Sequence, residues 1–278
     1  MGKTHSLVSI MLLCICLVIP IDLLQNTVWL LKENILFFIV GVIVLAGGAL
    51  LPDLDNSQSS AGSTLGFMGS IVTIFMQSTS SIIWTLMHSK RDRPPMTPHR
   101  YFWHTLVASF SIICLFLFGL PNGNETILQA IRNDSLIGFL TNNIVIVVFI
   151  FMVFMAVLCG SNMVLSKIIK FFNLPKALNY ICPVLVLIYI FTLNFSHLRV
   201  LGICIGLGYL FHCIEDFFAD SGVPLLWPIP IAGHMWFRCK FPITCQTGGI
   251  INTMIDFIVL AIDIILIVLI ILKGTNII

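Results

Sequence analysis

The stretch ILFFIVGVIVLAGGALL, residues 35–51, holds no charged side chain and is followed at once by Pro52-Asp53-Leu54-Asp55. An apolar run of this length can cross the roughly 30 Å hydrocarbon core of a bilayer as a helix. Proline interrupts helices, so the span is predicted to end at Pro52 and to place two carboxylates at the membrane surface. This stretch therefore indicates both a membrane fold and the first part of a site.

The composition of the whole chain agrees with a membrane protein. Of the 278 residues, 58% are hydrophobic and 9% are charged, and the mean hydropathy is +1.06, whereas soluble domains carry about 25% charged residues. Too few polar side chains exist to cover a water-soluble globule, so lipid must be the solvent. The net charge of +2 without a basic stripe predicts no nucleic-acid partner. The 9 cysteines show no C-x-x-C pairing, which favours buried reduced thiols.

The apolar runs predict an all-α, polytopic transmembrane helix bundle in a single integral membrane domain, residues 1–278. Seven runs are long enough to cross: Leu7–Leu24, Ile35–Leu51, Tyr101–Leu120, Ile144–Leu165, Leu178–Phe195, Val200–Phe218 and Ile250–Leu272. The first lacks an A-x-A cleavage site and is predicted to be a retained helix. An eighth segment, Thr64–Met87, contains the polar run Gln77–Ser81. We therefore expect about seven spans plus one interfacial or re-entrant helix.

Basic residues indicate the orientation in the membrane. If Thr64–Met87 does not cross, one face holds Lys3, Lys90, Arg91, Arg93, Arg100, Lys167, Lys170, Lys176, Arg238 and Lys240. The other face holds only Lys32, Arg132, Arg199 and Lys273. The positive-inside rule makes the first face and the N-terminus cytoplasmic, in a bacterial inner membrane. The bias survives if Thr64–Met87 crosses, so the placement of the polar residues has to decide that question.

Scarce polar residues gather in four parts of the chain, and ionisable groups at membrane depth are functional candidates by default. His212 and Asp216 are four residues apart and share one helix face. Asp53 and Asp55 follow the span that ends at Pro52. The remaining members of this group are His5, His99, Arg100 and His104.

In the seven-span topology all of these residues lie at the cytoplasmic membrane level, which predicts a metal site. The predicted ligands are His5, Asp53, Asp55, His99, His104, His212 and Asp216. Imidazole and carboxylate ligands without thiolates suit Zn first, with Mn, Fe and Ni as alternatives and one or more ions. Two ions about 3.5–4 Å apart would favour phosphoester chemistry. The predicted catalytic residues are Asp55, Arg100 and Asp216, with Arg100 holding a phosphate oxygen.

Each of these residues also has a purely structural interpretation. Asp53 and Asp55 would cap the next segment, His212 and Asp216 would form a buried hydrogen-bonded pair, and His99 would be an ordinary loop histidine. Glu215 points about 100° away from Asp216 around the helix and is predicted to lie outside the ligand set. These alternatives stay open at the level of the sequence.

A rigid loop follows the helix that carries His212. Residues 222–230 contain three prolines and one glycine and cannot continue a helix. The functional interpretation is a wall or lid for an amphiphilic substrate, with Gly222, Pro224 and Trp227 as substrate-binding residues. The alternative is a connector that dips into the membrane interface.

Taken in order, these motifs resemble the YdjM-like family of LexA-binding, inner-membrane-associated metal-dependent hydrolases (domain of unknown function 457). The resemblance rests on Thr4-His5, on Pro52-Asp53-Leu54-Asp55, on His99-Arg100-Tyr101-Phe102-Trp103-His104-Thr105, on His212 to Asp216 and on Gly222 to Pro228. It covers most of the chain and implies a metal-dependent hydrolase. Tyr101 and Trp103 depart from the family pattern, and Asn252 stands where a late Glu often occurs. The helix with His212 is also similar to one in zinc-dependent phospholipases C, a likeness of fold alone.

Three functions remain as hypotheses. The first is a membrane-bound metal-dependent hydrolase of a phosphoester or lipid-type substrate at the cytoplasmic face, with an amphiphilic or phosphorylated substrate. The second is a metal-ion or small-solute transporter, which would need polar residues at the membrane midplane. The third is a non-catalytic membrane scaffold whose polar cluster ties helices together.

Overall fold

The computed structural model describes residues 2–18, 34–92, 99–121, 123–133, 143–171, 177–241 and 249–274, together with positions 138, 173 and 175. The last part of the predicted first span, residues 19–24, and the basic residues Lys32, Arg93 and Lys176 lie outside these ranges. The side chain of Asn252 is likewise not described.

The described residues form helices and no strand, which confirms the all-α prediction for this part of the chain. In chain order the elements are α1 (Gly2–Val18), α4 (Ile35–Gly48), η1 (Pro52–Asp55), α5 (Ser60–Leu65), α6 (Phe67–Leu86), η2 (Phe102–His104), α7 (Leu106–Gly119), α8 (Ile127–Asn133), α10 (Ile144–Phe171), α11 (Leu178–Thr192), α12 (Phe195–Asp216) and α13 (Ile250–Gly274).

Several of these helices match a membrane in length and composition. Five segments are long and apolar enough to cross: Ile35–Asp55, Phe67–Leu86, Ile144–Met163, Phe195–Asp216 and Thr253–Ile270. Shorter apolar helices cover Thr4–Ile15, Leu106–Gly119 and Leu178–Thr192. By length and composition, the segment Phe67–Leu86 is thus one of the five that could cross a membrane. The sequence predicted that it is interfacial or re-entrant.

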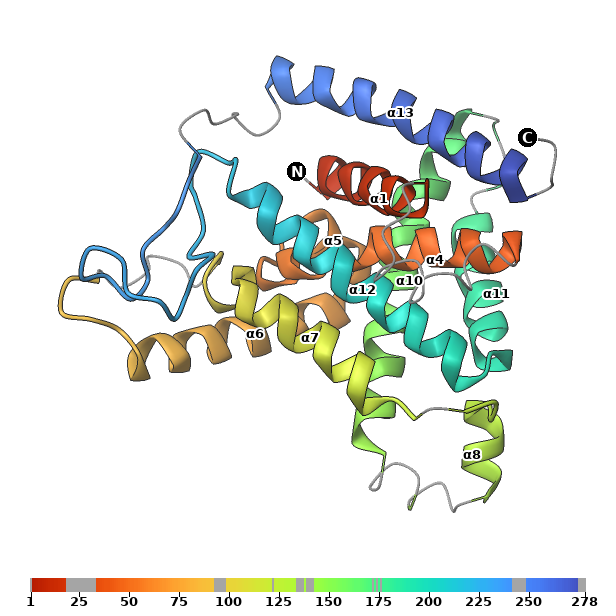
Figure 1. Cartoon of the computed structure of the whole chain (residues 1–278), viewed down its shortest axis with the longest axis horizontal. Helices are drawn as coiled ribbons and strands as arrows, with labels where there is room; N and C mark the ends of the chain where they lie inside the picture. Colours follow the sequence, from red (N-terminus) through yellow and green to blue (C-terminus); the bar gives the residue numbers. More distant parts are fainter. Residues whose placement is uncertain are drawn as a thin grey trace.

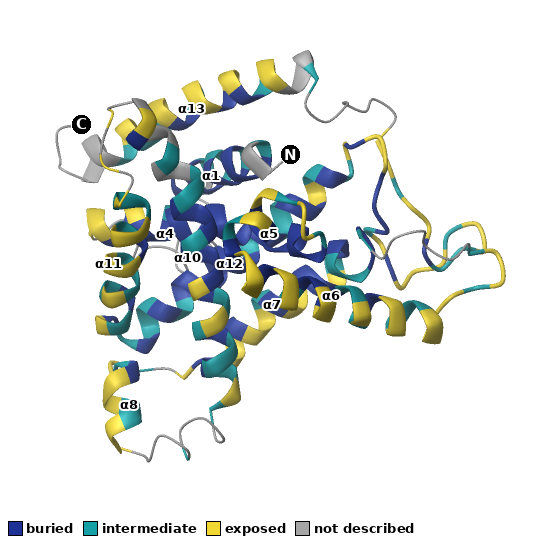
Figure 2. Cartoon of the chain, turned by 180° about the vertical axis from the view of Figure 1, so that it is seen from behind, coloured by how far each residue is buried: buried dark blue, intermediate teal, exposed yellow. Residues whose placement is uncertain are grey.

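Helices α4, α10 and α12 form the centre of the molecule, and α13 lies over α1 at one side (Figure 1). Seen from behind, α4 and α12 are mostly buried, whereas α6, α7, α11 and α13 present exposed residues outward (Figure 2). Many of the exposed side chains are large and apolar, as expected for surfaces that face lipid. The outer helices therefore cover the central ones.

Glycines let the central helices approach each other closely. A Cβ built on Gly160 of α10 would lie 2.1 Å from the carbonyl oxygen of Ile43, and one on Gly208 of α12 would lie 2.2 Å from that of Leu45. No side chain fits at such distances, so the backbones of α10 and α12 rest directly on α4. Small residues at helix contacts are typical of membrane proteins.

Two short breaks turn polar side chains inward. Helix α4 ends at Gly48, and the chain enters η1 with Pro52 in its first turn. After α6 the chain returns through Arg100, whose φ of 61° is left-handed, and passes into η2. Thr105 then caps α7, because its side chain accepts a hydrogen bond from the backbone of Ala108. These breaks place His and Asp side chains where regular helices would place apolar ones.

The loop after α12 is pinned by backbone hydrogen bonds. Val223 and Cys239 exchange two bonds at 3.1 and 2.9 Å. Gly222 has a φ of 59°, and a Cβ there would meet the carbonyl oxygen of Cys239 at 2.7 Å. Trp227 stacks on Trp236 with ring centroids 5.1 Å apart. The loop is therefore packed on itself and does not form an extension of the helix.

Candidate metal centre

Four segments of the chain meet in one buried polar cluster. Helix α1 contributes His5, the η1 segment contributes Asp53 and Asp55, the turn into η2 contributes His99, Arg100 and His104, and the end of α12 contributes His212 and Asp216. Among these, His104, His212, Asp55 and Asp216 have no exposed surface, and only His99 is appreciably open, with 27% of its side chain exposed. All seven residues predicted as ligands are thus brought together.

All four histidines of the cluster, His5, His99, His104 and His212, use the same ring nitrogen, Nδ1, for a protein contact. The Nδ1 of His212 donates to the carbonyl oxygen of Ala49 at 2.7 Å. The Nδ1 of His5 lies 2.8 Å from Glu215, and the Nδ1 of His104 lies 2.8 Å from Asp216. A hydrogen bond from one nitrogen to a carbonyl or carboxylate fixes the ring and its tautomer, which is the usual arrangement for histidines that bind metals.

The opposite ring nitrogens carry the strongest indication of a ligand. The Nε2 atoms of His5, His104 and His212 are buried and have no hydrogen-bond partner among the described residues. A buried polar atom without a partner is costly. Three such atoms in one cluster are what a bound cation would explain, since neutral imidazoles ligate through this nitrogen.

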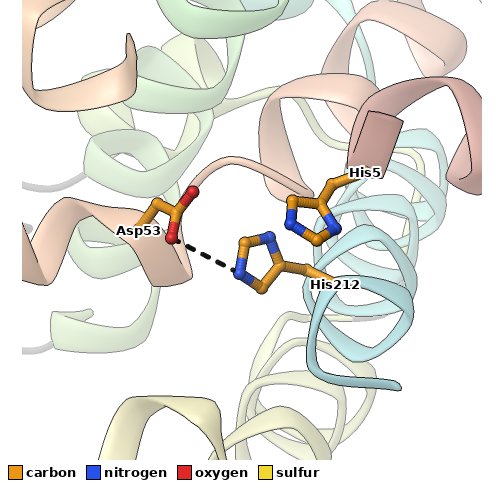
Figure 3. A group of neighbouring side chains, drawn as sticks. All are labelled: His5, Asp53 and His212. Carbon is orange, nitrogen blue, oxygen red and sulfur yellow. Dashed lines mark ion pairs between the residues drawn. The ribbon is translucent and has the colours of Figure 1, made fainter. Parts of the chain in front are cut away.

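Carboxylate oxygens lie close to these nitrogens without hydrogen bonding to them. The Nε2 of His212 is 3.6 Å from Asp53 and 3.4 Å from Asp216, and the Nε2 of His5 is 3.7 Å from Asp216. Two ligands of one Zn ion, each about 2.0–2.2 Å from it, lie roughly 2.8–3.6 Å apart. The observed separations of 3.4 and 3.6 Å lie within this range, and that of 3.7 Å is just beyond it. Figure 3 shows the rings of His5 and His212 beside each other, facing Asp53.

The ligand atoms fall into three overlapping groups that could hold an ion. They are His5 with Asp53 and His212, then Asp53 with His99 and His104, and finally His104 with His212 and Asp216, each with ligand atoms within 4.8 Å of one another. Asp53, His104 and His212 each belong to two groups. The cluster is therefore continuous, and adjacent positions within it share ligands.

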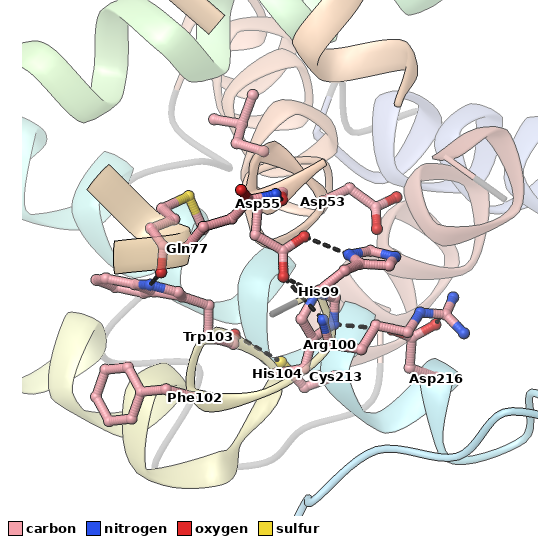
Figure 4. A network of polar contacts seen from close by, with 12 residues as sticks. Asp53, Asp55, Gln77, His99, Arg100, Phe102, Trp103, His104, Cys213 and Asp216 are labelled. Atoms are coloured by element: carbon pink, nitrogen blue, oxygen red, sulfur yellow. Dashed lines mark hydrogen bonds and ion pairs between the residues drawn. The ribbon is translucent and has the colours of Figure 1, made fainter. Parts of the chain in front are cut away.

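Asp55 has a different role from the other predicted ligands. Its Oδ1 lies 2.5 Å from Nδ1 of His99, and its Oδ2 accepts the backbone N–H of Arg100 at 2.9 Å. Both oxygens thus help to orient the turn, and Oδ2 also lies 3.4 Å from Nε2 of His104. None of the three groups found among the described residues contains Asp55. The amide of Gln77 donates to its backbone oxygen at 2.8 Å. In the view of Figure 4, Gln77 and Trp103 lie on one side of Asp55 and His99 on the other.

Arg100 links two carboxylates from different segments. Its left-handed backbone directs the N–H toward Asp55, while its Nη2 donates to Asp216 at 2.8 Å and its Nη1 donates to Ser221. A non-glycine residue in this conformation costs on the order of 1–3 kcal/mol and is found mainly at functional sites. Only 7% of the Arg100 side chain is exposed, so it places a fixed positive charge beside the cluster.

His104 lies between two carboxylates of the cluster. Its Nδ1 is 2.8 Å from Asp216 and its Nε2 is 3.4 Å from Asp55. A cation at this position would therefore be surrounded by groups of the opposite charge.

Of the predicted substrate-binding residues, one lies inside the cluster and the others lie next to it or outside it. Arg100 is inside it, and Gly222 follows Ser221, which Arg100 contacts. Pro224 is buried within the pinned loop. Trp227 packs against Phe102 and Trp236 at centroid distances of 5.5 and 5.1 Å, so it supports η2 from outside.

Sequence reasoning missed two residues that hold the cluster in place. Glu215, which helix geometry places outside the ligand set, lies against His5 and fixes its ring. Ser221 accepts from Arg100. The position of Glu215 next to Asp216 was the only available signal, because nothing in the sequence shows that α1 packs beside α12.

Comparisons with known proteins add no relative. No family model matches the chain, and neither a curated protein nor a solved structure matches it. The arguments about function therefore rest on the residues of the chain and on their geometry.

Proposed function

We propose that the chain is a membrane-bound metal-dependent hydrolase that cleaves a phosphoester in an amphiphilic substrate at the cytoplasmic face of a bacterial inner membrane. The observation that carries the proposal is the set of three buried Nε2 atoms, from His5, His104 and His212, that have no hydrogen-bond partner among the described residues. Each of these rings is oriented through its other nitrogen, as metal-binding histidines are.

The residues present fit a divalent transition metal. Imidazole nitrogens with carboxylate oxygens suit Zn, Mn, Fe or Ni, and the overlapping groups leave room for one or two ions. When bound, such an ion activates water and polarises a phosphoryl oxygen. His5, Asp53, His99, His104, His212 and Asp216 would hold the metal.

The other residues of the cluster position these ligands and the substrate. Asp55 orients His99 and the backbone of Arg100, and Glu215 orients His5. Arg100 is held by Asp216 and Ser221 and would bind an oxygen of the anionic group, because a guanidinium matches phosphate in charge and geometry. His99 lies on the open side of the cluster, which is where the scissile group would enter.

The proposed topology has seven spans with the N-terminus inside the cell. Asp55 precedes α6 and His99 follows it, and yet the two side chains touch at 2.5 Å. If α6 crossed the bilayer alone, the chain that follows it would have to cross back to make this contact. The contact therefore supports an α6 that lies in the interface or re-enters, and the distribution of basic residues supports a cytoplasmic site.

The resemblance to the YdjM-like family supports the same function. The motifs that carry it contribute His5, Asp53, Asp55, His99, Arg100, His104, His212 and Asp216, and these side chains are in mutual contact or separated by less than 5 Å from a neighbour in the cluster. Motifs spread over most of the chain thus supply one site.

The first test is the metal content of the detergent-purified protein. We compare the wild type with His212→Gln and with His197→Gln, a control on the same helix whose ring contacts Asn194 instead of the cluster. We expect near-stoichiometric Zn, Mn, Fe or Ni in the wild type and the control, and loss of the metal in His212→Gln. A folded wild type that stays free of metal after dialysis against these ions would refute the proposal and favour a scaffold.

The second test is activity on phosphoesters. The metal-loaded wild type should release phosphate or a phosphorylated head group from lipid phosphates, and Arg100→Gln should lower kcat/KM by about 100-fold, as loss of a charged contact to the transition state does. Equal activity of the two proteins would remove Arg100 from the mechanism.

One observation favours transport as a second candidate function. Helix α13 carries Asp256 and Asp263, which are buried at 6% and 3% exposure within an apolar helix. Both carboxylate oxygens of Asp263 lack a hydrogen-bond partner among the described residues. Intramembrane carboxylates often mark ion pathways. Uptake of radioactive Zn into proteoliposomes, abolished by Asp263→Asn, would establish this function.

A further inference from the structure

A large apolar cavity lies beside the metal centre. It has a volume of about 540 Å³ and is lined by residues of η1, α6, η2, α7, α10 and α12. Its lining includes Leu51, Leu54, Val72, Trp103 and Tyr209. This volume falls within the range of about 300–1,000 Å³ that is typical of ligand pockets.

The few polar atoms on the cavity wall are already used by the protein. Trp103 donates its Nε1 proton to Met76 and Thr79, both at 3.0 Å, and the hydroxyl of Tyr209 donates to the backbone oxygen of Trp103 at 2.7 Å. A polar ligand would find no partner here and would lose its hydrogen bonds to water. The chemistry of the wall therefore selects a hydrocarbon chain.

The rim of the cavity faces the direction from which lipid would come. Ile71, Phe75 and Phe151 line it and are 47%, 59% and 41% exposed. Exposed apolar side chains on a membrane helix contact acyl chains. An alkyl or prenyl chain can thus enter sideways from the bilayer.

The cavity and the metal centre share their walls. In η1, Leu54 lines the cavity, whereas its neighbours Asp53 and Asp55 belong to the cluster. Two further pairs repeat the pattern: Trp103 precedes His104 in η2, and Tyr209 lies three residues before His212 in α12. Figure 4 shows Trp103 on one side of Asp55 and His99 on the other.

We propose that this cavity binds the hydrocarbon chain of the molecule whose anionic head is bound by Arg100 and the metal centre. The substrate class is then a long-chain lipid phosphate and not a water-soluble phosphoester. The identity of the head group rests on the proposed function, whereas the binding of the chain can be measured without turnover.

The experiment uses an octadecyl phosphate that carries two bromine atoms near the middle of its chain, titrated into the full-length protein in detergent. Bromine quenches tryptophan fluorescence at short range, and Trp103 lines the cavity. We compare the wild type with Val72→Phe and Leu115→Phe, which fill the cavity from α6 and α7. Ile74→Phe is the matched control, since Ile74 lies on α6 at 65% exposure and does not line the cavity.

We expect saturable quenching in the wild type and in Ile74→Phe, most of which disappears in Trp103→Phe. The Kd should rise about tenfold or more in both cavity-filling variants, because small changes in an apolar pocket alter affinity by this amount. A brominated octadecyl trimethylammonium should bind at least tenfold more weakly than the phosphate. Quenching without saturation, or unchanged Kd values in both cavity variants, would overturn the proposal.

Three further outcomes separate this inference from the proposed function. Equal saturable binding of the phosphate and the trimethylammonium would identify a structural lipid site and would overturn the substrate assignment. Preferential binding of the phosphate to a protein that holds no metal would uphold the chain site and refute the hydrolase. Equal kcat/KM for hexyl and octadecyl phosphoesters would uphold the hydrolase and refute the chain site.

Discussion

Replacing Gly208 with alanine should weaken the metal centre without touching any ligand. A Cβ at this position would lie 2.2 Å from the carbonyl oxygen of Leu45 and 2.8 Å from the backbone nitrogen of Ala49. Both are backbone atoms of the α4 segment and cannot rotate away. To reach an ordinary contact distance, α12 must move away from α4 by about 1 Å, because packed helices leave no spare space.

That displacement can be followed to the ligands. His212 lies one helical turn beyond Gly208, and its Nδ1 donates to Ala49 at 2.7 Å. A shift of about 1 Å stretches this contact to roughly 3.7 Å, beyond the limit of a hydrogen bond. The distance of 3.6 Å between Nε2 of His212 and Asp53 grows to roughly 4.6 Å, too long for two ligands of one ion. Loss of such an orienting bond costs about 10–100-fold in metal affinity.

The assay is a competition titration with a chromophoric chelator in detergent, together with thermal unfolding of the metal-free protein. Overpacking should also cost about 1–3 kcal/mol of stability. Gly206→Ala is the control, because the added Cβ would meet chiefly the side chain of Ile113 on α7, away from the ligands. A metal affinity of Gly208→Ala within twofold of that of Gly206→Ala would refute the reasoning.

Three further predictions concern the residues around the cluster. Glu215→Gln replaces the carboxyl group that contacts and orients His5 and should weaken metal binding about 10-fold or more, measured by the same titration. Ser221→Ala removes a partner of Arg100 and should raise KM for a lipid phosphate more than it lowers kcat, measured by steady-state kinetics. Hydrogen bonds from Ser89, Met235 and Trp236 outweigh burial and lower the pKa of Asp92. The ionised carboxylate of Asp92 therefore stabilises the fold fully above about pH 4. This stabilisation is lost as the pH falls through the depressed pKa, and the fluorescence of Trp236 can follow the loss.

Controls make these three predictions specific. Glu125→Gln, in an exposed turn, should leave metal affinity unchanged, and an equal loss in Glu125→Gln and Glu215→Gln would contradict the orienting role. A Ser221→Ala variant that changes only kcat would argue against substrate binding through Arg100. The Asp92→Asn variant should lack the acid transition in Trp236 fluorescence. If the transition persists in that variant, it belongs to another group.

Much of the fold is encoded locally and could be predicted. Apolar runs and their polar ends indicate helices directly, because each span must satisfy its own backbone in lipid. The spacing of His212 and Asp216 likewise places both on one helix face. The η1 segment and the left-handed Arg100 could not be predicted, since both depend on contacts with residues far away in the chain.

The roles within the cluster were harder to predict than its members. Asp55 and Asp53 look equivalent in the sequence, but only the structure shows that both oxygens of Asp55 are engaged by His99 and Arg100. The hydrogen-bond partner of His212 is the backbone oxygen of Ala49. Because every residue has a backbone oxygen, the sequence cannot indicate this contact. Asp256 and Asp263 were not predicted as candidates, although their seven-residue spacing places both on one face of a helix.

The contact between His5 and Glu215 joins residues 210 positions apart, and this has a consequence for how the protein is made. At about 5–20 residues per second, roughly 10–40 s pass between synthesis of the two. During that time α1 carries a histidine into the membrane without its partner, and burying it alone in hydrocarbon is costly. We expect α1 to stay at the membrane surface until α12 has been synthesised. Metal binding by a chain that lacks α1 should then be restored when α1 is added as a separate peptide.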